Sequence, residues 1–140
     1  MIFSEAAFED AIIELFENMG YTHIYAPDID RDYTSPLLDD ELRNSLARLN
    51  KALPSDAIEE AISKLKNFDS GSLVQKNMVF MDYLQNGITV KFFDKGEERS
   101  AIVRLMDYQN VQNNSFYVVN QFTFLEGGNN RRPDIVLFIN

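Results

Sequence analysis

Near the end of the chain stands Arg131-Arg132-Pro133-Asp134-Ile135-Val136-Leu137-Phe138-Ile139-Asn140, in which a proline and an aspartate precede five apolar residues. Proline fixes φ and cannot donate a ladder hydrogen bond, so Pro133 belongs at the start of a strand rather than inside it. The pattern predicts a strand over residues 135–139, with Asp134 at the rim of a sheet. There the carboxylate either forms a turn, which the Pro-Asp spacing alone favours, or binds a ligand.

The composition indicates one domain of ordinary size, residues 1–140, because 45% of its 140 residues are hydrophobic. Its 22 acidic and 13 basic residues give a formal net charge of −9. Nucleic-acid binding draws much of its affinity from Lys and Arg side chains that neutralise phosphates. The domain by itself should therefore bind DNA poorly, and other segments or subunits would have to supply the positive surface.

Several site types are excluded or disfavoured by what the sequence lacks. No apolar run is long enough to span a membrane, and the acidic N-terminal segment is unlike a secretory signal. The absence of cysteine excludes disulfides and thiolate metal sites, and it fits a reducing cytoplasm. The single histidine, His23, cannot build a histidine-rich metal site, so we expect it in a loop or at a strand edge.

The first half of the chain is predicted to be helical. Ser4 is a suitable N-cap for a first helix that Gly20 ends. Apolar residues at helical spacing predict further helices around residues 42–49, 58–65 and 73–84, and Gly87 stops the last of them. We expect the apolar stripes of these helices to face the core. In the last helix, the stripe consists of Leu73, Phe80, Met81 and Leu84.

Two glutamates of the first helix differ from its other acids. Glu5 and Glu9 are one helical turn apart and lie on the flank of the apolar stripe, where the core can partly enclose a carboxylate. The remaining acids of this helix project to the opposite face and are most simply explained as a solvated surface.

The second half is predicted to form strands. Residues 88–92 and 101–106 alternate as a hairpin around an Asp-Lys-Gly-Glu turn, and residues 117–124 read as one long central strand. Gln121 on that strand either projects toward a site or, as strand positions favour, makes a cross-strand hydrogen bond. The order of elements predicts an α+β fold with N-terminal helices packed on a mostly antiparallel C-terminal sheet.

Taken together, several segments resemble the N-terminal nuclease domain of the restriction (motor) subunit of type I restriction enzymes. They follow the same order over almost the whole chain: Ser4-Glu5-Ala6-Ala7-Phe8-Glu9 with Met19-Gly20-Tyr21, Leu49-Asn50-Lys51-Ala52-Leu53-Pro54, Asn86-Gly87-Ile88, Val118-Val119-Asn120-Gln121-Phe122 and Arg131 to Asn140.

The resemblance implies a restriction-endonuclease-like core of the PD-(D/E)xK kind that depends on Mg²⁺. The family's aspartate after proline is a metal ligand and maps onto Asp134. A glutamate of the first helix also belongs to the family's site, which implies Glu9, with Glu5 as the alternative. Mg²⁺ prefers such hard oxygen ligands, and it polarises phosphoryl oxygens and lowers the pKa of bound water.

The 140 residues depart from the family pattern in one respect. The family continues into a further strand that carries a Glu-x-Lys, whereas this sequence ends first, so the second carboxylate and the lysine have no matching residues. Five apolar strand residues at a chain end would leave an edge open to pairing. We therefore expect a fragment, arising from the choice of cloned segment or from a truncated gene.

Two functions follow as alternatives. The first is part of a type I restriction endonuclease, which cleaves duplex DNA in an ATP-driven complex with modification and specificity subunits. No Gly-x-x-x-x-Gly-Lys-Ser/Thr stretch occurs here, so ATP would bind a motor elsewhere in the full subunit. The second is a non-catalytic module that keeps a nuclease-like fold and docks onto a partner through its acidic surface.

The missing residues lead to a first prediction. With Asp134 and at best one helix glutamate as ligands, the affinity for Mg²⁺ should be weak and the activation of water incomplete. This polypeptide alone should therefore not cut DNA. Incubation with supercoiled plasmid and Mg²⁺ checks this expectation. Metal-dependent nicking that disappears in the Asp134→Ala variant would contradict it.

Overall fold

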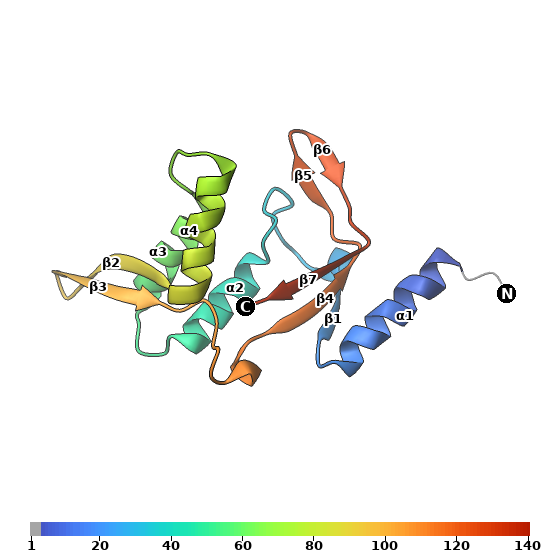
Figure 1. Ribbon diagram of the computed structural model, residues 1–140, viewed down its shortest axis with the longest axis horizontal. Coiled ribbons are helices and arrows are strands. Elements are labelled where there is room, and N and C mark those ends of the chain that lie inside the picture. The colour runs from blue at the N-terminus through green and yellow to red at the C-terminus, as the bar shows by residue number, and fades with distance from the viewer. Residues whose placement is uncertain (1–3) are drawn as a thin grey trace. The chain divides into compact units, whose positions relative to one another are not determined.

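The computed structural model describes residues 4–140 and confirms the α+β class. By contacts within the chain, these residues form two compact units (Figure 1). Unit 1 contains residues 4–39 and 115–139, and unit 2 contains residues 40–114 with residue 140. The residues singled out from the sequence as candidate site residues all fall in unit 1.

Unit 1 begins with helix α1 (Glu5–Asn18), whose ends follow the prediction. The Ser4 side chain accepts a hydrogen bond from the backbone N–H of Ala7 at 3.1 Å, and Gly20, with φ +101°, lies just beyond the other end. The apolar stripe is buried less than predicted. Phe8, Leu15 and Met19 are exposed, whereas Ile13 is buried.

A three-stranded sheet follows in unit 1, with the order β1-β4-β7. Its strands are β1 (Thr22–Tyr25), β4 (Phe116–Asn120) and β7 (Ile135–Ile139). β1 pairs with β4 in parallel, and β4 pairs with β7 antiparallel. Val118 and Val119 are fully buried, so the prediction that their strand is central is confirmed. A short 3-10 helix η1 (Ala26–Asp28) follows β1.

Three details of unit 1 differ from the sequence-based expectation. The predicted strand over 117–124 ends at Asn120, because Gln121 has a left-handed φ of +58° that breaks the extended backbone. A separate hairpin of β5 (Phe124–Glu126) and β6 (Asn129–Arg131) then forms, and its two three-residue strands were not predicted. The parallel strand β1 was not predicted, because a four-residue strand has too few positions to show alternation.

Unit 2 contains helix α2 (Asp39–Leu49) from its second residue onward, helices α3 (Ser55–Lys66) and α4 (Leu73–Asn86), the hairpin of β2 (Ile88–Asp94) and β3 (Glu97–Val103), and the 3-10 helix η2 (Val111–Asn113). The hairpin register confirms the turn predicted at residues 94–97. The alternating buried residues of β2 pack against α3. The core of the unit is formed by Leu46, Ala57, Ile58, Ala61, Ile62, Ile88, Val90, Phe92, Val103 and Leu105.

The two ends of α4 have clear local causes. Ser72 and Gln75 form a capping box at its start, in which each side chain accepts from the other residue's backbone N–H. Gly87 ends the helix at φ +82°, where a Cβ atom would lie 2.7 Å from the carbonyl oxygen of Val103. Only glycine fits that position.

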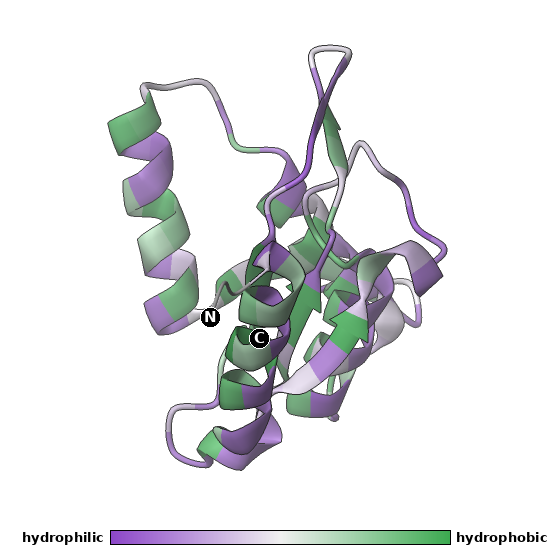
Figure 2. Ribbon diagram, turned by 90° about the vertical axis from the view of Figure 1, so that its right-hand side faces the viewer, coloured by the Kyte–Doolittle hydropathy of each residue, from purple (hydrophilic) through white to green (hydrophobic). Residues whose placement is uncertain are grey.

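The prediction that the stripe of α4 faces the core is wrong. Leu73 is 74% exposed and Met81 51% exposed, and Phe80 is exposed as well. Only the flank that carries Tyr83 and Leu84 is partly buried against the unit 2 core. Apolar residues therefore run along α4 (Figure 2), and most of them are exposed. Helical spacing identifies an apolar face, but it does not say what covers that face.

The buried side chain of Asn50 leads to a prediction for stability. Its amide donates to the carbonyl oxygens of Leu46 (2.8 Å) and Arg104 (2.9 Å) and accepts from the backbone N–H of Arg104 (2.8 Å). In Asn50→Ala the backbone N–H and carbonyl of Arg104 lose these bonds, whereas the Leu46 carbonyl still accepts from the backbone N–H of residue 50. The substitution should lower the free energy of unfolding by about 2–4 kcal/mol. Urea denaturation measures the change.

Asn67 provides the matched control. It also follows a helix and donates its side-chain amide to the carbonyl four residues earlier, but it is exposed and lies on the surface. Asn67→Ala should cost less than about 1 kcal/mol because water replaces the lost hydrogen bond. Equal losses in the two variants would contradict the role given to Asn50.

Candidate functional site

Asp134 lies directly before β7, and its side chain is exposed. Within residues 4–140, no hydrogen bond or ion pair engages its carboxylate, although its backbone carbonyl accepts from the N–H of Gln121 at 3.3 Å. Asp134 lies in a bend before the strand, but its carboxylate makes no turn hydrogen bond among the described residues. Both carboxylate oxygens are available to a ligand.

The strand register places Gln121 opposite Asp134. Asn120 pairs with Ile135 as the last pair of the β4–β7 ladder, and the next residue on each side is Gln121 and Asp134. The hydrogen bond between their backbones continues the ladder by one step. The end of β4 and the start of β7 are thereby fixed at one edge of the unit 1 sheet.

Glu9 of α1 reaches the same edge. The Nε2 atom of Gln121 donates to the Glu9 carboxylate, at 3.1 Å from Oε1 and 3.4 Å from Oε2. Glu9 is half-buried, whereas Glu5 is exposed. The structure therefore brings Glu9, Gln121 and Asp134 together through a chain of hydrogen bonds, and Glu5 has no part in that chain. The cross-strand bond preferred for the Gln121 side chain was the wrong prediction, because its partner is on the helix.

Aromatic side chains hold the other end of α1 against β4. The ring of Tyr21 packs edge-to-face with Phe16 (centroids 5.2 Å apart) and with Phe116 (5.5 Å). Phe16 is near the C-terminal end of α1, while Phe116 begins β4. The helix therefore runs antiparallel to the strand, and Glu9, about two turns earlier, comes beside the end of β4 where Gln121 lies.

Arg31 supports the segment that follows Gln121. Its guanidinium lies 3.9 Å from the ring centroid of Phe122 and donates to the carbonyl oxygen of Thr123. The ring of Tyr33 is on the same cation, at 4.6 Å. Burial lowers the pKa of Arg31 below its usual value, and the neighbouring Tyr33 and Asp32 oppose that effect. These contacts of Arg31, which we call the Arg31 clamp, restrain the backbone next to Gln121.

The single histidine has a structural role, in agreement with the expected position at a strand edge. His23 is on the edge strand β1, and its Nε2 lies 2.7 Å from Oδ1 of Asn120 on β4. Because the amide oxygen only accepts, this contact requires the Nε2–H tautomer or the imidazolium. The bond joins the two parallel strands.

The donor set at the edge of the sheet suits a hard cation but is incomplete. Asp134 and Glu9 supply carboxylate oxygens, the ligand type that Mg²⁺ prefers. Across residues 4–140, no group of three or more His, Cys, Asp or Glu side chains is placed to hold a metal ion. Any cation would therefore need further ligands from water, substrate or another segment.

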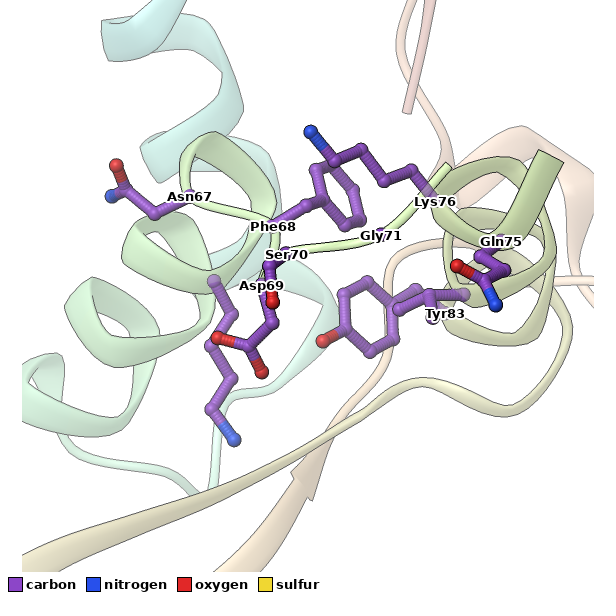
Figure 3. A pocket seen from close by; sticks show the side chains of 10 residues that line it. Asn67, Phe68, Asp69, Ser70, Gly71, Gln75, Lys76 and Tyr83 are labelled. Atoms are coloured by element: carbon purple, nitrogen blue, oxygen red, sulfur yellow. The ribbon is translucent and has the colours of Figure 1, made fainter. Parts of the chain in front are cut away.

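Other features considered are two surface arginines and a pocket in unit 2. Arg131 and Arg132 are exposed, and Arg131 is 3.8 Å from Glu126 in a solvated ion pair. Unit 2 has a small pocket of about 210 Å³ beside the loop that joins α3 and α4 (Figure 3). The stacked rings of Phe68 and Tyr83 line it, with centroids 6.0 Å apart. None of the candidate site residues lines this pocket.

These elements define a restriction-endonuclease-like α+β protein. Within residues 4–140, no helix is both long and apolar enough to cross a membrane. A sequence profile described as "Type I restriction enzyme R protein N terminus" matches residues 2–140. The chain belongs to this family, which confirms the resemblance found in the sequence.

Curated relatives agree with the family assignment. The chain is 28% identical to the HindI endonuclease subunit, a type I restriction enzyme of Haemophilus influenzae, over 98% of this chain and 14% of that protein. It is also 28% identical to the putative MjaIXP endonuclease subunit of Methanocaldococcus jannaschii, over 94% of this chain and 14% of that protein. The putative MjaVIIIP subunit of the same organism is 34% identical over 75% of this chain and 10% of its own length. The chain thus spans about one seventh of the first two relatives.

The aromatic contacts of Tyr21 lead to a prediction for this edge of unit 1. Tyr21→Ala removes both edge-to-face pairs, so it should destabilise the protein by about 1–3 kcal/mol and release α1 from β4. The backbone amide hydrogens of α1 should then exchange faster with solvent, and the increase should be larger than for the amides of β4 and β7. Tyr25→Ala is the control, since Tyr25 is exposed and has no ring partner in the described part of the chain. An unchanged exchange rate in α1 of Tyr21→Ala would refute the anchoring role.

Proposed function

We propose that the chain is the N-terminal part of the nuclease domain in a type I restriction subunit, which cleaves duplex DNA with a divalent cation. The observation that carries the proposal is the meeting of Glu9, Gln121 and Asp134 at one sheet edge in a chain of this family. The relatives are themselves named as endonuclease subunits of type I restriction enzymes.

Asp134 and Glu9 are the residues that we propose as metal ligands. Asp134 has a free, exposed carboxylate on a backbone held by the β4–β7 ladder. Glu9 is oriented by Gln121 and is half-buried, which favours it over the exposed alternative Glu5. Two carboxylates with waters and substrate phosphate form the usual environment of Mg²⁺ in proteins that act on phosphates.

The residues of this chain would bind and orient a divalent cation, but they would not supply every group that phosphodiester cleavage needs. A bound Mg²⁺ supplies polarisation of a phosphoryl oxygen and a water of lowered pKa. Asp134 and Glu9 contribute negative charge that concentrates a cation at the sheet edge. No lysine is at this edge in the contacts of residues 4–140 to stabilise charge that develops on the phosphate. We propose that the Glu-x-Lys strand belongs to the subunit outside these 140 residues.

The remaining parts of the reaction are also assigned to other segments and subunits. A net charge of −9 gives the chain little attraction for the DNA backbone by itself. We propose that DNA is held by other parts of the subunit and by modification and specificity subunits. The ATP-driven motor likewise lies outside the 140 residues, since the relatives are about seven times longer than the matched region.

A second function is favoured by a different observation. Helix α4 exposes Leu73, Val74, Met78 and Met81 on its surface, as a docking module would. In that case the nuclease-like fold would serve only for protein contacts. A cation would then bind Glu9 and Asp134 no better than the acids elsewhere on the surface.

Magnesium titration followed by NMR separates the two functions. For a nuclease site, we expect saturable shifts centred on Glu9, Gln121 and Asp134. Asp134→Asn keeps the side-chain shape but removes a charged ligand, so it should weaken Mg²⁺ binding by about tenfold or more. Asp69→Asn, at an exposed acid of unit 2, is the matched control and should leave the affinity unchanged.

The opposite result is equally clear. Shifts scattered over surface acids, with the same dependence on Mg²⁺ in the wild-type chain and in Asp134→Asn, would support the docking module and refute the metal site.

A further inference from the structure

We infer that Gln121 is the positioning residue of this site: it holds the Glu9 carboxylate at the sheet edge and thereby sets the affinity for a divalent cation. The inference rests on the proposed function and adds a residue and a role to it. It follows from three features of Gln121, namely its two hydrogen bonds, its backbone conformation and the neutrality of its amide.

The first feature is that Gln121 joins both proposed ligands. Its side-chain Nε2 donates to Glu9 on α1, and its backbone N–H donates to the carbonyl oxygen of Asp134. Glu9 and Gln121 are 112 residues apart in the chain, so this bond fixes a long-range relation between helix and sheet. The amide orientation is defined chemically, because an ionised carboxylate accepts hydrogen bonds and only the NH₂ end can donate.

The second feature is the backbone conformation. Gln121 has φ +58°, in the left-handed region that glycine adopts most easily. Glycine would satisfy the turn after β4 without strain, yet the position holds a glutamine. Strained residues of this kind tend to lie at functional sites where their side chain is needed. The hydrogen bond to Glu9 is the contact that a glycine could not make.

The third feature is that the amide carries no charge. A lysine or arginine at this position would orient Glu9 but also neutralise it and repel a cation. The amide occupies part of the lone-pair capacity of the carboxylate and leaves the remainder for a metal ion or its water. A neutral donor therefore preorganises Glu9 while it preserves the negative charge on which metal binding depends.

The backbone around Gln121 is restrained on both sides, as a positioning role requires. The β4–β7 ladder precedes it, and Arg31 binds the carbonyl oxygen of Thr123 two residues later. Phe122 between them is buried, and its ring packs against Phe138 of β7 with centroids 5.1 Å apart. The side chain of Gln121 thus extends from a fixed point.

The test compares Gln121→Gly with a matched control. Gln121→Gly removes the amide and relieves the left-handed backbone, so the protein should keep its melting temperature while its Mg²⁺ affinity falls about three- to tenfold. Lys95 is the other non-glycine residue with positive φ among those described (φ 52°) and lies in the β2–β3 turn. Lys95→Gly relieves similar strain and should leave Mg²⁺ affinity unchanged.

The readout is the Mg²⁺-dependent shift of the side-chain carboxyl carbons, measured separately for Glu9 and Asp134. In Gln121→Gly the response of Glu9 should weaken more than that of Asp134, which a general loss of structure would not produce. Gln121→Asn provides a second variant, because asparagine tolerates the left-handed region but is one methylene too short to reach Glu9. It should weaken binding to a similar extent, and it decides the question if the glycine variant does not fold.

The possible failures are distinguishable. If the wild-type chain binds Mg²⁺ at Glu9 and Asp134 and both Gln121 variants bind it equally well, the positioning role is overturned while the proposed function stands. If the wild-type chain shows no response at Glu9 and Asp134, the proposed function falls and this inference with it.

Discussion

The pairing of β4 with β7 is the constraint on which the site depends. It fixes the register in which Asn120 meets Ile135, and the next step along the ladder joins the backbones of Gln121 and Asp134. Val118 and Val119 follow one another in β4 and so point to opposite faces, and both are fully buried, so the strand is packed on both faces of the sheet. The position of a surface carboxylate is thus determined by the packing of a buried strand.

Helix α1 contributes the second carboxylate through contacts at two points. Aromatic rings pack near its C-terminal end, and a hydrogen bond from Gln121 reaches Glu9. Much of the rest of its apolar stripe is exposed, so these contacts matter more than the amphipathic pattern itself. A helix held in this way can present Glu9 at a defined place without being enclosed by the core.

Local signals in the sequence were sufficient for most element boundaries. Ser4, Gly20 and Gly87 act on their own helices, and Pro133 marks the start of a strand, so each could be recognised from its chemistry alone. The exposed face of α4 and the early end of β4 could not be predicted. The first depends on which elements cover the helix, and the second on a left-handed residue that is not glycine. The link between Gln121 and Glu9 joins distant segments, and no local spacing records it.

The scaffold of the candidate site is built from contacts within unit 1 alone. The ladder, the aromatic contacts and the Arg31 clamp all lie within unit 1, and none of them requires a bound cation. The neutral amide of Gln121 orients the Glu9 carboxylate without removing its negative charge. The positions of Glu9, Gln121 and Asp134 are therefore set by packing and hydrogen bonds within unit 1. Under the proposed function, this chain would define the position of the site, and other parts of the subunit would supply its remaining groups.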